Sequence, residues 1–98
     1  MVLENSDIEK LNGYFAKTET LRAGIFGSYA RGEANDSSDL DILIEFEPTI
    51  SLLTFVRYKR ELEELIGKKI DLLTPNSISP YLYPQVQKDL QLIYERER

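Results

Sequence analysis

Apolar residues spaced at i, i+3 and i+4 predict two amphipathic helices in this chain. The first covers residues 6–17, where Ser6 and Glu9 have the spacing of a capping box. The second covers residues 51–66, begins at Ser51 as a candidate N-cap, and stops at the glycine that follows. A single helical turn is expected directly after the first strand, and a short helix before the last apolar stretch.

Short apolar runs bounded by turn residues predict three strands. Residues 39–46 alternate between an apolar face and a largely acidic face, which is the clearest strand pattern in the chain. Residues 21–26 form an apolar run that closes on a Gly-Ser turn, and residues 69–73 form a third short strand. A small polar loop is expected over residues 32–38, whereas the apolar stretch 90–94 stays without an assigned type.

The order of these elements predicts the fold class. Strand, helix and strand over residues 39–73 form a βαβ unit, which places its two strands parallel in nearly all known cases. Antiparallel pairing of 21–26 with 39–46 would bring the end of one strand beside the start of the next. Residues 1–98 are too few for a second domain, so we expect a single α+β or α/β domain with a small mixed β-sheet flanked by helices.

The net charge of −5 is confined to one segment. Residues 31–47 contain six acidic residues and one basic residue, so the rest of the chain is balanced. The chain has no Cys and no His, which excludes disulfides, thiolate sites, ordinary zinc sites and nucleophile pairs that depend on His. Much familiar hydrolase chemistry is therefore excluded.

The sequence also predicts where the protein works. Residues 1–10 carry three acidic residues where a signal peptide needs a basic start, and no stretch approaches the roughly 20 apolar residues that span a bilayer. We therefore expect a soluble cytoplasmic protein with no membrane contact. The acidic balance argues against direct nucleic-acid binding, because phosphate contacts need clustered Lys and Arg.

Three aspartates stand at the starts of two predicted parallel strands. Asp39 and Asp41 are about 6.7 Å apart along one strand, and Asp71 lies on the same face of a neighbour about 4.8 Å away. Three carboxylates within about 5 Å repel by roughly 3 kcal/mol per pair at an effective dielectric of about 20. A bound divalent metal is the simplest way to relieve this repulsion, since Mg²⁺ binds carboxylates, waters and phosphates. Two such ions about 3.5–4 Å apart recur in enzymes that catalyse nucleotidyl transfer.

The pair Gly27 and Ser28 directly follows the first predicted strand. A glycine at a strand-to-helix turn lets the backbone approach a phosphate, and the helix start offers unpaired N–H groups. Three residues later, the guanidinium of Arg31 can add a positive charge that binds phosphate. Gly-Ser alone is common in turns, and Asp-x-Asp alone is common on polar strand faces, so it is the joint occurrence that indicates a phosphate and metal site.

These motifs carry a specific resemblance. Phe-Gly-Ser-Tyr-Ala-Arg-Gly-Glu, from Phe26, and Ser-Asp-Leu-Asp-Ile-Leu-Ile, from Ser38, hold the Gly-Ser and Asp-x-Asp pairs ten residues apart. With Asp71 on a later strand, the arrangement resembles the signature of the DNA polymerase beta type nucleotidyltransferase superfamily. Within it, the chain resembles over nearly its whole length the minimal nucleotidyltransferases, which are antitoxin partners of HEPN-domain toxins.

The resemblance implies the polymerase beta type nucleotidyltransferase fold and a Mg²⁺-dependent enzyme with ATP as substrate. Asp39 and Asp41 would bind both Mg²⁺ ions, and Asp71 would bind the ion that activates the acceptor hydroxyl and receive its proton. Family members transfer AMP from ATP to a tyrosine hydroxyl of the cognate HEPN-domain RNase toxin and so neutralise it.

The same resemblance assigns the remaining motif residues. Gly27 and Ser28 would hold the β and γ phosphates of ATP. Arg31 occupies the position of the family's Ala-Arg-Gly arginine and would contact a phosphate or the partner. No motif residue departs from the pattern in a way that indicates an inactive enzyme.

Two alternatives stay open. A non-catalytic antitoxin could sequester the HEPN partner through an aromatic interface at Tyr81, Leu82 and Tyr83, unless these residues simply pack on the sheet. A small-molecule or nucleic-acid 3′ hydroxyl could instead be the acceptor. That version requires a basic groove, for which residues 57–60 and 68–69 are the candidates.

Overall fold

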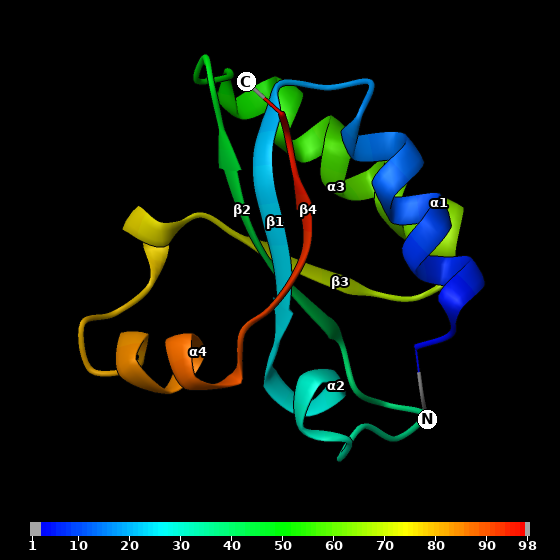
Figure 1. Ribbon diagram of the computed structural model, residues 1–98, viewed down its shortest axis with the longest axis vertical. Coiled ribbons are helices and arrows are strands. Elements are labelled where there is room, and N and C mark those ends of the chain that lie inside the picture. The colour runs from blue at the N-terminus through cyan, green and yellow to red at the C-terminus, as the bar shows by residue number, and fades with distance from the viewer. Residues whose placement is uncertain (1–2, 98) are drawn as a thin grey trace.

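The computed structural model of the protein describes residues 3–97, which form a four-stranded sheet with helices on both faces (Figure 1). The elements in chain order are α1 (Asn5–Phe15), β1 (Thr20–Phe26), α2 (Gly27–Arg31), β2 (Leu40–Phe46), α3 (Leu52–Ile66), β3 (Ile70–Leu73), the 3₁₀ turn η1 (Pro75–Ser77), α4 (Tyr83–Asp89) and β4 (Gln91–Glu95). The strand order is β3-β2-β1-β4; only the β2–β3 pair is parallel. The small mixed sheet and the parallel βαβ unit are therefore confirmed.

The main hydrophobic core lies between the sheet and helices α1 and α3, which pack together on one face. Its largest fully buried side chains come from both helices and from β2, and they are Leu11, Phe15, Leu40, Ile42, Ile44 and Leu62. Burying a large apolar side chain stabilises a fold by roughly 1.5–3 kcal/mol. The apolar face of β2 thus fixes this strand firmly, and with it the direction of the acidic face.

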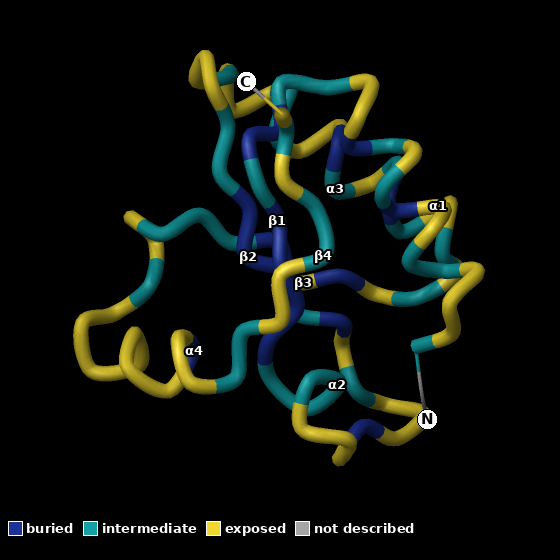
Figure 2. Tube along the Cα trace, in the orientation of Figure 1, coloured by how far each residue is buried: buried dark blue, intermediate teal, exposed yellow. Residues whose placement is uncertain are grey.

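The opposite face of the sheet is covered only in part (Figure 2). Phe26 of β1, Leu43 of β2 and Val86 of α4 form a second, smaller buried cluster there. Leu43 belongs by alternation to the acidic face of β2, yet it is buried because α4 packs against it. Helix α4 therefore packs on the face of β2 that also carries Asp41 and Glu45.

Helix α3 has the boundaries that its sequence predicts. The Ser51 hydroxyl accepts a hydrogen bond from the Thr54 N–H at 3.1 Å, and Gly67 ends the helix with a left-handed φ of +73°. Within residues 3–97, no helix has the length and apolar character needed to cross a membrane.

The predicted capping of α1 is wrong. The N-cap is Glu4, whose N–H donates to the Asp7 carboxylate at 3.3 Å, so the helix begins before Ser6. Leu3 packs against the core just ahead of this cap and fixes the path of the chain into the helix. The helix also ends earlier than predicted, at Phe15, where the Thr18 hydroxyl donates to the carbonyl oxygen of Phe15 at 2.9 Å.

The unassigned apolar stretch near the C-terminus is a strand. As β4 it pairs antiparallel with β1, so that Arg22 faces Glu95 and Ala23 faces Tyr94. Leu90, directly before it, lies over Gly24, where an added Cβ would come within 2.7 Å of the Leu90 side chain. Only a glycine permits this close approach.

Tyr81, Leu82 and Tyr83 do not pack on the sheet. Tyr81 is 93% exposed and Leu82 is 61% exposed, in the segment that leads into α4 (Figure 2). The alternative that these residues simply pack on the sheet is therefore wrong, and the cluster under α4 is formed by Phe26, Leu43 and Val86 instead. An exposed aromatic surface is left on this side of the molecule.

Candidate active site

Strand β2 brings the predicted site residues together through its two neighbours. In the antiparallel pair, Asp41 of β2 faces Phe26 at the end of β1, so Gly27 and Ser28 begin α2 directly beside it. In the parallel pair, Asp41 faces Asp71 of β3. Both predicted pairings are confirmed, and they place the Gly-Ser turn and two carboxylates at one edge of the sheet.

The backbone of Gly27 lies directly against the Asp41 carboxylate. A Cβ added to Gly27 would lie 2.1 Å from Oδ2 of Asp41, far inside van der Waals contact. Gly27 also has a φ of +74°, in the left-handed region that L side chains rarely adopt. Glycine is thus required here twice, by the local backbone conformation and by the space that the carboxylate occupies.

Asp41 carries an electrostatic conflict. Its pKa is raised from an ordinary 3.8 to about 6, first by burial and then by the negative charges of Asp71 and Asp39. Arg31 acts in the opposite sense and lowers this pKa, but less strongly. Asp71 and Asp39 therefore lie close enough to Asp41 to repel its charge, as their positions in the sequence predict.

The three carboxylates are not equally enclosed. Asp41 is half-buried, whereas Asp71 and Asp39 are exposed, and Asp39 stands immediately before β2. Asp39 lines a small polar pocket of about 420 Å³ that also includes Lys68 and Lys69. Within residues 3–97, no three acidic side chains are gathered tightly enough to enclose one ion as they lie.

The donor set nevertheless fits Mg²⁺. This ion usually binds one or two carboxylates and completes its shell with waters and substrate phosphates, so it needs no cage of protein groups. Asp41 and Asp71 supply two hard oxygen donors side by side, and none of the three aspartates forms an ion pair within the described residues. A cation here would relieve the repulsion that raises the pKa of Asp41.

Arg31 does not extend freely toward this edge. Its guanidinium bonds to Glu33 at 3.0 Å and to Asp89 of α4 at 2.5 Å, and these hydrogen bonds raise its pKa. Asp89 was not identifiable from the sequence, because it lies 58 residues away and follows no motif. The predicted phosphate or partner contact of Arg31 stays a prediction.

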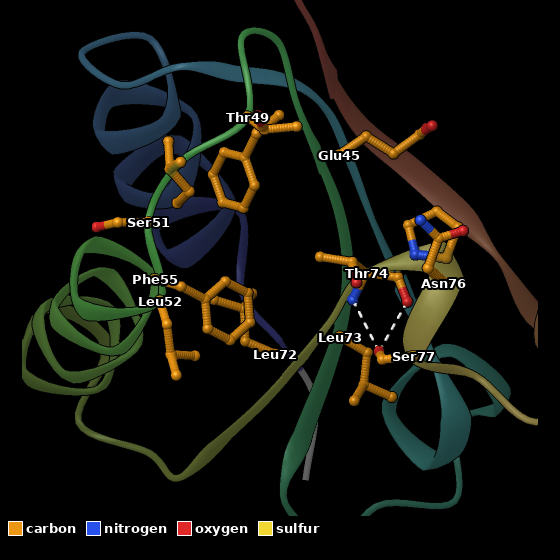
Figure 3. Close-up of a pocket in the computed structure, with 13 residues that line it drawn as sticks. Glu45, Thr49, Ser51, Leu52, Phe55, Leu72, Leu73, Thr74, Asn76 and Ser77 are labelled. Atoms are coloured by element: carbon orange, nitrogen blue, oxygen red, sulfur yellow. Dashed lines mark hydrogen bonds between the residues drawn. The ribbon is translucent and has the colours of Figure 1, made fainter.

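A larger groove lies at the other end of the same strands (Figure 3). It has a volume of about 770 Å³ and runs between Leu52 and Phe55 of α3 and Leu73 at the end of β3. On its far side the Thr74 N–H donates to the Ser77 hydroxyl oxygen at 3.2 Å. None of the aspartates or Gly-Ser residues lines this groove, so size alone does not locate the candidate active site.

Comparison with known proteins identifies the family of this chain. The sequence model of the family described as "Polymerase beta, Nucleotidyltransferase" matches residues 9–98. The chain belongs to this nucleotidyltransferase family. The match contains every motif residue discussed above, so the resemblance inferred from the Gly-Ser and Asp-x-Asp motifs is confirmed.

Three similar proteins bear more specific names than that of the family. A Methanocaldococcus jannaschii protein, provisionally named a protein adenylyltransferase, is 57% identical over 65 residues, which cover 66% of this chain and 70% of the relative. The protein adenylyltransferase MntA of Thermococcus cleftensis is 42% identical over 67 residues, 68% of each chain. A solved structure provisionally described as a minimal nucleotidyltransferase is 36% identical, with a TM-score of 0.76 over 88% of each chain.

A more distant nucleotidyltransferase structure shares the fold. It is the Shewanella oneidensis complex of a tri-AMPylated HEPN toxin with its MNT antitoxin, at 18% identity and a TM-score of 0.73 over 96% of this chain and 74% of that one. At this identity the likeness establishes the architecture alone.

We expect Gly67→Ala to lose about 1 kcal/mol of stability because Gly67 has a positive φ, and Gly27→Ala to lose more, because its methyl group also meets the Asp41 carboxylate. Only Gly27→Ala should lose divalent-cation binding, since its methyl group must displace the Asp41 carboxylate, whereas nothing lies within 4 Å of a Cβ at Gly67. Thermal unfolding with and without Mg²⁺ checks both effects. Equal stabilisation of the two variants by Mg²⁺ would contradict the role given to the close contact.

We expect Asp41→Asn to stabilise the metal-free protein at pH 7.5 and to have little effect at pH 3.5. A carboxyl whose folded pKa is raised costs nothing while both states are protonated, and its penalty grows as pH rises from about 4 through about 6. We expect a gain of about 1 kcal/mol, less than the full pKa shift implies, because water screens a half-buried group. Unfolding curves across this pH range measure the gain.

The exposed acid Glu64 of α3 offers a matched control, since Glu64→Gln also removes one negative charge. That variant should show no comparable pH dependence. A stability difference between wild type and Asp41→Asn that is the same at pH 3.5 and 7.5 would refute the electrostatic explanation.

Proposed function

We propose that the protein is a Mg²⁺-dependent adenylyltransferase antitoxin that transfers AMP from ATP to a tyrosine hydroxyl of a HEPN-domain RNase toxin and thereby neutralises it. The single observation that carries the proposal is the contact between the Gly27 backbone and the Asp41 carboxylate, with Asp71 as the next neighbour of Asp41. This arrangement joins a phosphate-binding turn to a pair of metal-binding carboxylates, which is what transfer of a nucleotidyl group requires.

Each residue has a role in this proposal. Gly27 and Ser28 hold the β and γ phosphates, with the glycine allowing the close backbone approach. Asp39 and Asp41 would hold two Mg²⁺ ions, and Asp71 would supply a further carboxylate ligand. The bound ions would neutralise the charge of the triphosphate and lower the pKa of the acceptor hydroxyl.

The transfer step exchanges one oxygen bond at the α phosphorus for another. The tyrosine oxygen forms a bond to the α phosphorus, the bond from that phosphorus to the bridging oxygen breaks, and pyrophosphate leaves. The phenolic proton passes to the carboxylate of Asp71, which is exposed and can release it to water. The half-buried Asp41 is less suited to exchange protons with solvent and serves as a metal ligand.

The choice of a protein acceptor rests on the relatives. Two of them bear adenylyltransferase names, and the distant Shewanella oneidensis complex pairs an MNT antitoxin with an AMP-modified HEPN toxin. The described residues offer little to enclose a small acceptor, because Asp71 is exposed at the edge of an open sheet face. A partner protein would complete the site from outside.

A second candidate function is sequestration of the same partner without catalysis. The observation that favours it is the exposed surface formed by Tyr81 and Leu82, since aromatic residues are enriched among binding hot spots. The two functions are compatible, because this surface could dock the partner while the acidic edge modifies it. They differ in whether suppression of the toxin needs the aspartates.

We expect incubation with Mg²⁺, ATP and the HEPN-domain partner to increase the partner's mass by one or more AMP groups on tyrosine. Replacing Asp39 and Asp41 by Ala should lower the rate at least about 1,000-fold, because it removes both shared metal ligands. Intact-protein and peptide mass spectrometry measure the adduct and its site.

A triple variant with Asn at positions 39, 41 and 71 separates the two candidates in cells. Loss of toxin suppression by this variant supports catalysis, while full suppression supports sequestration. The Tyr81→Ala and Leu82→Ala double variant serves as the counterpart, since it should weaken partner binding and leave the acidic edge intact. An adduct that forms without metal, or on a residue other than tyrosine, would refute the proposed reaction.

A further inference from the structure

Helix α2 carries the proposed phosphate-binding turn but is poorly anchored by apolar contacts. It has five residues, too few for a stable helix on its own, and none of them is fully buried. Tyr29 and Ala30 pack only partly against the main core. The position of Gly27 and Ser28 must therefore depend on other contacts that hold this short helix.

Two polar links join α2 to the segment around α4 and β4. The Arg31 guanidinium bonds to the Asp89 carboxylate at 2.5 Å, and the Gln91 side-chain amide donates to the Ala30 carbonyl oxygen at 3.0 Å. Both join residues about 60 positions apart in the sequence. They tie the last turn of α2 to the junction where α4 ends and β4 begins.

Asp89 is itself held firmly. Its side chain is only 7% exposed, and its other carboxylate oxygen accepts a hydrogen bond from the Gln85 amide at 3.0 Å. On either side of it in the chain, Val86 is buried against Phe26 and Leu43, and Leu90 lies over Gly24. Asp89 thus presents a fixed negative charge to α2 from a packed part of the fold.

Arg31 is poorly placed to serve as a phosphate ligand while these contacts last. Two carboxylates, those of Glu33 and Asp89, share its single positive charge, so the local sum is negative. A nearly buried carboxylate that loses its cation is also costly, because few waters can replace the lost partner. The arrangement favours a guanidinium that stays with Asp89.

We infer that the Arg31–Asp89 pair acts as a strut that positions α2, and that Asp89 is a positioning residue for nucleotide binding. The inference rests on the proposed function for its effect on ATP. Loss of the strut lets α2 move, so that Gly27 and Ser28 no longer face Asp41 in the geometry that binds the triphosphate. Arg31 thereby acts through α2 rather than by touching a phosphate.

The test is a double-mutant cycle with charge reversal, read out as the dissociation constant for AMP-PNP with Mg²⁺. We expect Asp89→Asn and Arg31→Gln each to weaken binding about tenfold, and the double variant to be no worse than either alone. The reversed pair, Arg31→Asp with Asp89→Arg, should recover to within about threefold of wild type. Glu33→Gln is added to the reversed pair, because Glu33 would otherwise repel the acidic side chain introduced at position 31. The same substitution is also made alone as a control.

Hydrogen exchange provides a readout that needs no ligand. The Glu33 N–H donates to the Ser28 carbonyl oxygen at 2.8 Å and reports whether the last turn of α2 is closed. Its exchange should be faster in Asp89→Asn and return to the wild-type rate in the reversed pair. Arg22→Gln, which breaks an arginine–carboxylate pair between β1 and β2 away from this edge, should change neither exchange nor binding.

The outcomes distinguish the possible failures. Tighter nucleotide binding by Asp89→Asn, or no recovery in the reversed pair, would show that Arg31 contacts phosphate directly and overturn the strut. Unchanged exchange of the Glu33 N–H in every variant would overturn it as well. Wild-type protein that binds no AMP-PNP would instead refute the proposed function, and the exchange data would still decide the strut.

Discussion

The register of β2 against its two neighbours is the constraint on which the rest of the structure depends. Leu40, Ile42 and Ile44 of this strand are buried under α1 and α3, which leaves only one face on which its acidic residues can lie. A slip by one residue would turn every side chain to the other face, so the hydrophobic core fixes the position of Asp41. Phe26 and Asp71 are then placed beside it by the backbone hydrogen bonds of the sheet.

The fold accepts a local electrostatic cost at this place. Two other acids of the segment have arginine partners, since Glu33 pairs with Arg31 and Glu45 pairs with Arg22. Asp41 has no such partner within the described residues and shows a raised pKa. The net negative charge of the chain suggests that it repels ATP. This charge is concentrated around Asp41, where a bound divalent cation would reverse the local charge. Conflicts of this kind are typical of functional sites.

The parts of the fold that follow local rules were predictable from the sequence. The alternation of β2, the cap at Ser51 and the stop at Gly67 are each set by residues close to one another in the chain. The start of α1 was not predictable, because the pairs Glu4–Asp7 and Ser6–Glu9 have the same spacing. The packing of Leu3 against the core favours the first pair. The stretch that forms β4 has no distinctive pattern of apolar and polar residues. It is a strand because its backbone hydrogen-bonds to β1.

The candidate site likewise has features that the sequence predicts and features that it does not. The aspartates and the Gly-Ser turn follow a motif and could be identified from it, whereas the contact of Gly27 with Asp41 needs the strand register. Asp89 could not be predicted, because its importance arises only when α4 folds beside α2. Similarly, the exposure of Tyr81 depends on which residues fill the space under α4.

The most direct test of the central claim is the position of a bound cation. Crystals grown with Mn²⁺ and AMP-PNP allow the metal to be located by anomalous scattering. The account predicts a peak about 2.0–2.2 Å from carboxylate oxygens of Asp41 and Asp71, with the triphosphate against Gly27 and Ser28. A manganese peak only at other acidic residues, with the nucleotide away from Gly27, would contradict it.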